Sequence, residues 1–393
     1  MHPLLLLLIL LSAIPDTMAA PVVKELLVDR YGATAPSAQI FNGINLLGAL
    51  AAVPLLLAVR RTWGSRAVLI AASLVDAVLL AVMALPLGIA WTLALRCLEG
   101  VTDVLVFAAL FDIVRGRSAG RLGVGLGIAS SPLLIGLGLG AVLGGVVVRQ
   151  AAGVGSAMWL FGVSAALSAA VGVLAWRWRQ IDSYPRAHVR ASADAPFSGS
   201  STERMWPPLA MAFSDRATGG LLTGTLPIAL AQVLGYSPMI RGLLVGLPLL
   251  LMALGTGPSG WLCDCMGAKR IRVAAGLCYA AAFALLPFAS VSPTALGLVM
   301  LVVGVSASGL FASSVSLAAL AGPSSVTLGA FRAAGDLGFL SGTILSVLLL
   351  TSLGGNEPNF SDYSAVLIVF AAFHLLTTSV TALAMRGAPR TQS

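Results

Sequence analysis

Charged residues are scarce in this 393-residue chain, since only 10% of its residues are Asp, Glu, Lys or Arg. A typical soluble domain contains about 25% charged residues. Hydrophobic residues make up 58% of the sequence, so the chain has too few charged groups to cover its own surface in water. The scarcity of charge excludes an ordinary soluble domain and favours a protein whose apolar surface lies in membrane hydrocarbon.

The side chains that carry most enzyme chemistry are also few, because the sequence has three histidines and four cysteines. Cys263 and Cys265 are separated by one residue rather than two, so the cysteines lack a metal-binding spacing. No phosphate loop of the form G-x-x-x-x-G-K-[ST] and no H-E-x-x-H zinc motif occurs. We therefore expect no enzyme activity, no cofactor, no metal site and no ATP-driven transport.

The net charge of +8 could indicate nucleic-acid binding, but the placement of the basic residues excludes that class. The arginines lie between apolar blocks, where the positive-inside rule expects them, and no basic face interleaved with aromatic residues occurs. The expected partners are the lipid bilayer, a small-molecule substrate and protons, with no nucleic acid. The expected oligomeric state is a monomer.

Long apolar blocks recur along the chain, and each is close to the roughly 20 residues that a membrane-spanning helix needs. Helices are expected because a helix satisfies its own backbone hydrogen bonds in lipid, and because the blocks lack the alternation of barrel strands. The candidate spans lie near residues 3–22, 37–59, 67–86, 89–113, 122–148, 156–178, 207–232, 239–262, 271–289, 294–320, 325–352 and 363–385.

A polar stretch rich in Ser, Pro and Arg separates the sixth span from the seventh and has the composition of a flexible linker. The sequence therefore predicts an all-α polytopic membrane protein of about twelve transmembrane helices in two pseudo-symmetric six-helix bundles. The predicted domains are an N-terminal bundle over residues 1–180, a cytoplasmic linker over 181–206 and a C-terminal bundle over 207–393.

The first apolar block has a leucine-rich core and ends in Met18-Ala19-Ala20, features that also occur in signal peptides. No positive charge precedes this core, and Asp16 interrupts it before any cleavage site. We therefore predict that the block is retained as the first span.

Lys and Arg are unequally divided between the two sets of loops. One set has Lys24, Arg30, Arg149 and Arg241. The other set collects Arg60, Arg61, Arg66, Arg115, Arg117, Arg121, the arginines of the linker, Lys269, Arg270, Arg272, Arg386 and Arg390. Because basic loops stay on the cytoplasmic side, this bias predicts that both termini and the linker are cytoplasmic in an inner or plasma membrane.

The two halves of the sequence also resemble each other weakly. Gly136-x-x-x-Gly140 in the fifth span has a counterpart in Gly338-x-x-x-Gly342 in the eleventh. Asp16 in the first span can be aligned with Asp215 in the seventh. The common order of these matches indicates an internal duplication, which is typical of transporters.

Three segments carry recognisable motifs. Residues 260–270 read G-W-L-C-D-C-M-G-A-K-R, residues 96–100 read R-C-L-E-G, and residues 136–145 read G-L-G-L-G-A-V-L-G-G. They resemble the G-x-L-x-D-x-x-G-x-K/R loop motif, the R-x-x-x-G motif and the G-x-x-x-G-P-x-x-G-G motif of the major facilitator superfamily. The matching positions are Gly260, Asp264, Gly267, Lys269 and Arg270 in the first motif and Gly136, Gly140, Gly144 and Gly145 in the third.

The resemblance implies a secondary transporter in which the first motif is a latch between the halves and the third accompanies export by antiport. Two departures weaken this: Ala141 replaces the proline of the third motif, and residues 60–66 lack the acidic residue of the family's strongest latch. We favour efflux of a small amphiphilic or drug-like compound. The alternatives are proton-coupled import of a sugar, organic acid or other metabolite, and a non-transporting sensor or scaffold.

Ionisable residues inside the predicted spans are the candidate site residues, because each costs about 2.5–3.5 kcal/mol in mid-membrane. Arg96, Glu99 and Asp103 share one face of the fourth span near the depth of Asp16, which predicts an Asp16–Arg96–Glu99 cluster. The proton-coupling candidates are Asp16, Glu99, Asp103, Asp336 and His374, and their expected charge partners are Arg96, Asp215, Arg216 and Arg332.

In the C-terminal half, Arg332 and Asp336 are four residues apart on one helical face, and Asp215, Asp336 and His374 lie at a similar depth. Asp76, on the third span, is expected to serve packing or to line a solvent channel. The alternative for all these charges is that they bridge helices within one half and carry no protons.

Overall fold

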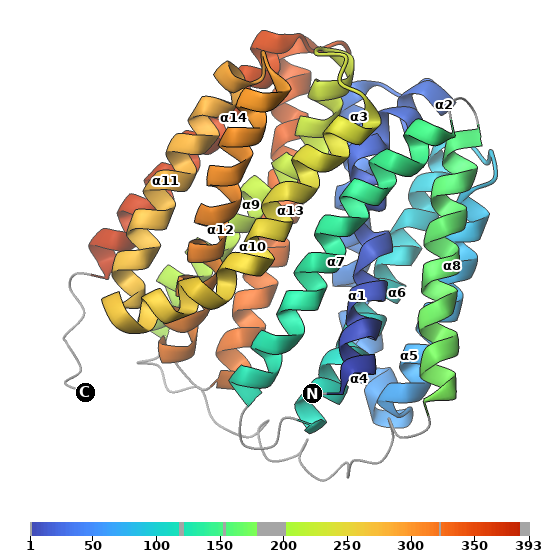
Figure 1. Ribbon diagram of the computed structural model, residues 1–393, viewed down its shortest axis with the longest axis horizontal. Helices are drawn as coiled ribbons and strands as arrows, with labels where there is room; N and C mark the ends of the chain where they lie inside the picture. The colour runs from blue at the N-terminus through green and yellow to red at the C-terminus, as the bar shows by residue number, and fades with distance from the viewer. Residues whose placement is uncertain (1, 118–121, 152–154, 179–201, 322–323, 386–393) are drawn as a thin grey trace.

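The computed structural model describes residues 2–117, 122–151, 155–178, 202–321 and 324–385. Its long helices form two groups that stand side by side (Figure 1). The N-terminal group consists of α1 (Pro3–Met18), η1 (Ala20–Val22), η2 (Lys24–Val28), α2 (Asp29–Tyr31), α3 (Ala35–Ala51), α4 (Val53–Thr62), α5 (Ser65–Met83), α6 (Ile89–Arg117), α7 (Leu122–Gln150) and α8 (Gly155–Arg177). The C-terminal group consists of α9 (Thr202–Gln232), α10 (Pro238–Met266), α11 (Ala268–Ala289), α12 (Pro293–Ala321), α13 (Ser324–Gly354) and α14 (Phe360–Ala384). The predicted all-α architecture of two helical bundles is confirmed.

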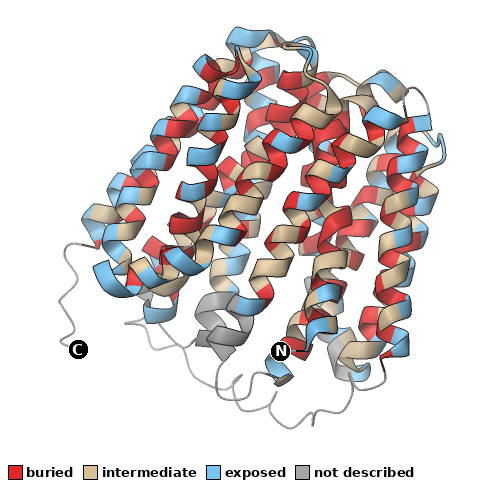
Figure 2. Ribbon diagram, viewed as in Figure 1, coloured by how far each residue is buried: buried red, intermediate tan, exposed pale blue. Residues whose placement is uncertain are grey.

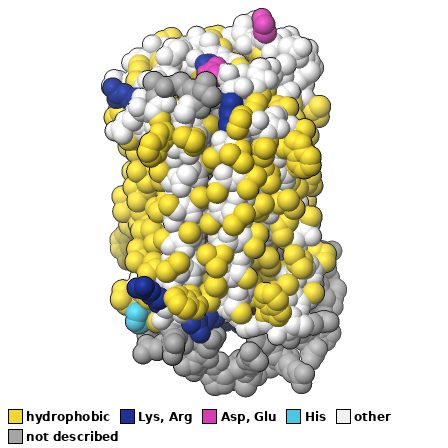
Figure 3. Space-filling view, turned by 90° about the vertical axis from the view of Figure 1, so that its right-hand side faces the viewer, with side chains coloured by type: hydrophobic (Ala, Val, Ile, Leu, Met, Phe, Trp, Pro, Cys, Tyr) yellow, Lys and Arg dark blue, Asp and Glu magenta, His cyan; other side chains and the backbone are white. Residues whose placement is uncertain are grey.

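Most of the predicted spans are also apolar enough to cross a membrane. Among the described residues, nine helices meet the length and hydropathy that this requires. The second predicted span falls short because α3 ends at Ala51 and α4 begins at Val53, while α6 and α9 carry charged residues within their length. Figure 3 shows the expected surface, with hydrophobic side chains over the middle of the face and Lys or Arg side chains near its two ends.

Glycines on α7 bring its backbone into direct contact with α1. A Cβ atom at Gly136, Gly140 or Gly144 would meet the backbone carbonyl oxygen of Leu10, Ile14 or Met18, respectively. Small residues at such positions allow the close helix approach on which packing in lipid depends. The span-five glycine motif therefore forms the surface that joins α7 to α1.

The same α7 also contacts the other bundle, because a Cβ atom at Gly145 would meet the carbonyl oxygen of Pro238 in α10. Gly242 of α10 in turn faces the backbone of Ala141, so the residue that replaces the motif's proline lies at the contact between the bundles. A single helix thus packs its glycine-rich faces against both halves of the molecule.

The C-terminal bundle repeats the α1–α7 contact with α9 and α13. Gly338 and Gly342 of α13 face the carbonyl oxygens of Phe213 and Ala217 in α9. When Ile14 is matched to Phe213 and Met18 to Ala217, Asp16 corresponds to Asp215.

The match of Gly136-x-x-x-Gly140 to Gly338-x-x-x-Gly342 and the match of Asp16 to Asp215 differ from each other by about one helical turn. With Asp16 aligned to Asp215, Gly140, which contacts Ile14, is the counterpart of Gly338, which contacts Phe213. Sequence spacing could not show this shift, because glycine recurs at every fourth residue from Gly136 to Gly144 and any two of these positions give the same pattern.

The two bundles are joined by hydrogen bonds toward the end that holds η1, η2 and α2, at the top of Figure 1. Asn42 of α3 donates to the backbone carbonyl of Thr223 in α9 at 3.0 Å. Arg241 of α10, 1% exposed, donates to the carbonyl of Pro21 at 2.7 Å and to the Glu25 carboxylate. Figure 2 shows buried residues concentrated in this upper part of the molecule.

The close α1–α7 contact predicts that one added methyl group at Gly144 destabilises the fold. Gly144→Ala forces a Cβ atom against the Met18 carbonyl, and overpacking of this kind costs about 1–3 kcal/mol. Gly162→Ala is the matched control, because Gly162 is exposed on α8 with nothing within 4 Å of the new Cβ. Thermal unfolding of the two purified variants in detergent should show a lower midpoint for Gly144→Ala alone. Equal midpoints would mean that α1 and α7 are not packed this closely.

Candidate functional site

Arg96 is the centre of a buried charge cluster in the N-terminal bundle. Arg96 and Glu99 are 2% and 1% exposed, and the Arg96 guanidinium donates to the Glu99 carboxylate. Its Nη2 donates to the backbone carbonyl of Asp16 at 3.1 Å and lies 3.9 Å from the Asp16 carboxylate. The ring of Phe41 covers the guanidinium, with the Cζ atom 5.0 Å from the ring centroid. The structure thus brings together Asp16, Arg96 and Glu99 from α1 and α6.

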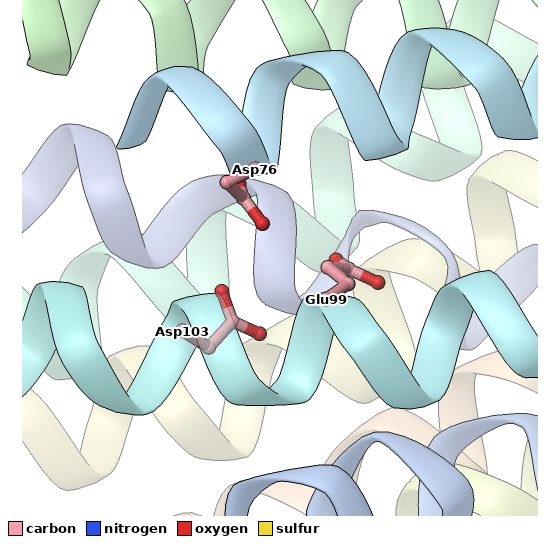
Figure 4. Close-up of side chains that lie close together, drawn as sticks. All are labelled: Asp76, Glu99 and Asp103. Carbon is pink, nitrogen blue, oxygen red and sulfur yellow. The ribbon is translucent and has the colours of Figure 1, made fainter. Parts of the chain in front are cut away.

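Asp103 lies one turn beyond Glu99 on α6, where its carboxylate accepts a hydrogen bond from Asn45 Nδ2 at 2.9 Å. Asp76 of α5 is 4% exposed and accepts hydrogen bonds from the hydroxyls of Thr102 and Ser168, both at 2.7 Å. The carboxylates of Asp76, Glu99 and Asp103 approach one another to within 4.8 Å (Figure 4). Depth along the spans does not predict that Asp76 belongs to this group.

Asp336 is the centre of a charge cluster in the C-terminal bundle, with Arg332 and Arg216 as its partners. Arg332 Nε donates to Asp336 Oδ2 at 2.9 Å across one turn of α13, and Arg216 Nη2 of α9 lies 3.9 Å from Asp336 Oδ1. The Arg216 guanidinium also lies over the ring of Phe339. The side chains of Arg332 and Arg216 are 66% and 46% exposed, although both belong to long helices of the bundle.

Asp215 and His374 form a separate, buried group with Arg272. The Arg272 guanidinium donates two hydrogen bonds to the Asp215 carboxylate, at 2.7 and 2.8 Å. His374 is fully buried, with Nδ1 3.8 Å from Asp215 Oδ1 and its ring 4.7 Å from the ring of Tyr279. Depth along the helices predicts a group of Asp215, His374 and Asp336, and the distribution of Lys and Arg places Arg272 in a cytoplasmic loop. The structure instead pairs Arg272 with Asp215, because Arg272 points from α11 into the bundle.

The charges of the two bundles face each other across the molecule. Asp16 of α1 is acted on electrostatically by Arg216, Arg332 and Asp336 of the C-terminal bundle as well as by Arg96. Its side chain is 31% exposed, and that of Arg216, on which Asp16 also acts, is 46% exposed. Partly exposed charges of both signs, from both bundles, therefore lie near enough to act on one another.

The cytoplasmic loop motif lies mostly in a helix. Gly260 and Asp264 belong to α10, which continues to Met266, beyond the predicted end of the eighth span at residue 262. Gly267 ends the helix with a φ of 89°, a conformation that glycine adopts readily. Lys269 Nζ then donates to the backbone carbonyl of Met385 at 2.8 Å, and Arg270 is exposed. The motif thus joins the ends of α10, α11 and α14 within one bundle.

Comparison with known proteins gives one family. The sequence matches the family described as Major Facilitator Superfamily twice, over residues 5–213 and residues 208–393. No curated protein matches the sequence significantly. The double match agrees with the repeated α1–α7 and α9–α13 contacts.

Solved structures of transporters share the fold over almost the whole chain. A bacterial homologue of the human lysosomal transporter Spinster, inward-facing and occupied, has a TM-score of 0.78 at 14% identity, covering 98% of this chain and 96% of that chain. The same homologue, unoccupied, has a TM-score of 0.74 at 15% identity, covering 97% and 95%. The nucleoside transporter NupG has a TM-score of 0.70 at 14% identity, covering 98% and 100%. With a family match to both of its halves, this multi-pass membrane protein belongs to the major facilitator superfamily.

Proposed function

We propose that the protein is a secondary active transporter that moves a small molecule by alternating access to a site between its two bundles. The observation that carries this proposal is the group of charges that face each other there. Asp16 of one bundle and Arg216, Arg332 and Asp336 of the other act on one another electrostatically, and the side chains of Asp16, Arg216 and Arg332 are partly exposed. Charges are expensive inside a membrane and are usually retained there for function.

The side of the membrane to which the proposed site opens is inferred from the distribution of charge. The end that holds the α10–α11 junction carries Lys269 and Arg270, so we infer that it faces the cytoplasm. The bonds from Arg241 to Pro21 and Glu25 then lie at the outer end. The structure corresponds on this basis to an inward-facing state, the state for which the Spinster homologue is named.

Protonation of Asp16 and Asp336 is the proposed coupling step. Each carboxylate now faces arginine, Asp16 toward Arg96 and Asp336 toward Arg332 and Arg216. A proton on either carboxylate removes a charge on which those arginines act, and so changes the relative stability of the two states of the transporter. Charged and neutral forms of the site thereby favour different bundle arrangements.

The substrate class and direction are inferred from the same residues. Arg216 and Arg332 have exposed side chains and act electrostatically on Asp16, which favours a small amphiphilic compound with an acidic group. Export is favoured by the α7 glycine motif, and import of a metabolite by proton symport is the alternative. A thermal-shift screen of metabolites and antimicrobials identifies the ligand, and flux in vesicles under an imposed pH gradient decides the direction. Stabilisation by a ligand without flux would instead support a sensor or scaffold.

The carboxylate mechanism predicts that Asp16→Asn combined with Asp336→Asn abolishes proton-coupled transport. We expect flux of the screened ligand, driven by a pH gradient in reconstituted vesicles, to fall by more than about tenfold, or about 1.4 kcal/mol. Glu357→Gln is the matched control, because Glu357 is exposed in the connection that follows α13. Full proton-coupled flux in the double variant would show that these two carboxylates do not couple transport to protons.

The contact between Arg241 and Glu25, at the inferred outer end, predicts that Glu25→Gln favours the outward-facing state. Loss of the carboxylate leaves the buried Arg241 without its charge partner, and breaking such a pair costs about 3–5 kcal/mol. Thr223→Cys, placed at the contact between α3 and α9, reports opening through its reaction with a membrane-impermeant maleimide in whole cells. Labelling should rise in the Glu25→Gln background.

The control for this labelling is Thr223→Cys in the Glu357→Gln background, which should label as slowly as Thr223→Cys alone. Equal labelling in the Glu25 and Glu357 backgrounds would mean that the Arg241–Glu25 pair does not hold the outer end closed.

A further inference from the structure

A small cavity lies inside the N-terminal bundle, apart from the charges that face the other bundle. Its volume is about 10 Å³, and its walls come from α1, α5, α6 and α8. It is lined by Ser12, Ser73, Asp76, Asp103, Val106, Ser168 and Val171. A space of this volume holds one water-sized particle, and five of its seven lining side chains offer oxygen atoms.

Two carboxylates that line the cavity, and the Glu99 carboxylate close to both, have the spacing of cation ligands. Oxygen atoms of Asp76, Glu99 and Asp103 all lie within 4.8 Å of one another (Figure 4). Ca²⁺ binds oxygen at about 2.3–2.6 Å, so two of its ligands can be at most about 4.6–5.2 Å apart. Mg²⁺ binds at about 2.0–2.1 Å, which limits its ligands to about 4.2 Å. The observed spacing therefore fits a cation of Ca²⁺ size, which is also the size of Na⁺.

Two polar atoms at this place have no hydrogen-bond partner among the described residues. Ser73 Oγ belongs to a side chain that is 1% exposed and lines the cavity, and Glu99 Oε2 belongs to a carboxylate that is equally buried. A buried polar atom without a partner is destabilising. Both atoms carry lone pairs, which a bound cation would satisfy.

The charge balance also favours a cation. Asp76, Glu99 and Asp103 supply three negative charges when ionised, and Arg96 pairs with Glu99. Hydroxyl groups of Thr102 and Ser168 donate to Asp76, and Asn45 donates to Asp103, but these donors are neutral. The ionised group would therefore keep an excess of negative charge in a buried place, where compensation by a cation is strongly favourable.

We propose that Asp76, Glu99 and Asp103, together with the hydroxyl of Ser73, form a binding site for one hard cation of the Na⁺ and Ca²⁺ size class. The site lies within a single bundle and is distinct from the proposed substrate space. It is connected to that space by Arg96, which bonds both Glu99 and the backbone of Asp16. Cation binding thus acts on the Arg96 guanidinium group, which also faces Asp16, the proposed coupling carboxylate.

The first test is thermal unfolding of the full-length protein in detergent, with chlorides of Na⁺, K⁺, Ca²⁺ or Mg²⁺ compared with choline chloride at equal ionic strength. We expect a saturable rise in the midpoint with Na⁺ or with Ca²⁺, and the effective ion identifies the cation. A smaller effect of K⁺ and Mg²⁺ follows from their size. The proposal is overturned if neither Na⁺ nor Ca²⁺ exceeds choline, or if Mg²⁺ is equally effective.

The second test uses Asp76→Asn and Ser73→Ala, with Glu357→Gln and Ser379→Ala as matched controls at exposed positions. We expect the two site variants to weaken the apparent affinity for the effective cation at least about tenfold, as when groups that support a metal site are lost. Ser73→Ala removes a hydroxyl that has no hydrogen-bond partner. Its apparent cation affinity therefore tests the site even where Asp76→Asn fails to fold. Unchanged affinity in Ser73→Ala and in any folded Asp76→Asn would refute the site. Binding is measured without flux, so this outcome is independent of the transport proposal.

Discussion

Hydrocarbon accepts apolar side chains but not unpaired charges, and this constraint determines where the charged residues of the long helices lie. Arg96 pairs with Glu99, Arg272 with Asp215 and Arg332 with Asp336. Breaking a buried pair leaves one charge uncompensated and costs about 3–5 kcal/mol. Of these three pairs, Asp215–Arg272 joins two helices, α9 and α11. The buried Arg96–Glu99 pair lies within α6, and the more exposed Arg332–Asp336 pair lies within α13.

The hydrocarbon of the membrane also explains why the packing of these helices depends on glycine. Apolar side chains gain little by leaving lipid for a helix interface, so close packing and hydrogen bonds must hold the helices together. Gly140 and Gly144 bring α7 against α1, and Gly145 brings it against α10. Because α7 contacts both bundles through small residues, the bundles can meet closely where Arg241 bonds Glu25 and still present exposed charges elsewhere.

Much of the fold could be predicted from the sequence, because the length and hydropathy of each apolar block indicate a helix and its approximate ends. Spacing also placed Arg332 and Asp336 on one face, and the structure shows the bond between them. It could not place Asp76 beside Glu99 and Asp103, or Arg272 beside Asp215, since these contacts join different helices. Position along a helix gives depth, whereas the rotation of the helix and the identity of its neighbours arise from packing.

Arg96 contacts two carboxylates of the N-terminal bundle, those of Asp16 and Glu99, which have different surroundings. On one side lies Asp16, which is partly exposed toward the charges of the other bundle. On the other side lies Glu99, fully enclosed beside Asp76 and Asp103. A guanidinium group cannot lose its charge in a protein, so its attraction must be shared between these carboxylates. Neutralising one of them, by a proton or by a cation, leaves more of that attraction to the other, and a change inside one bundle thereby reaches the surface that faces the second.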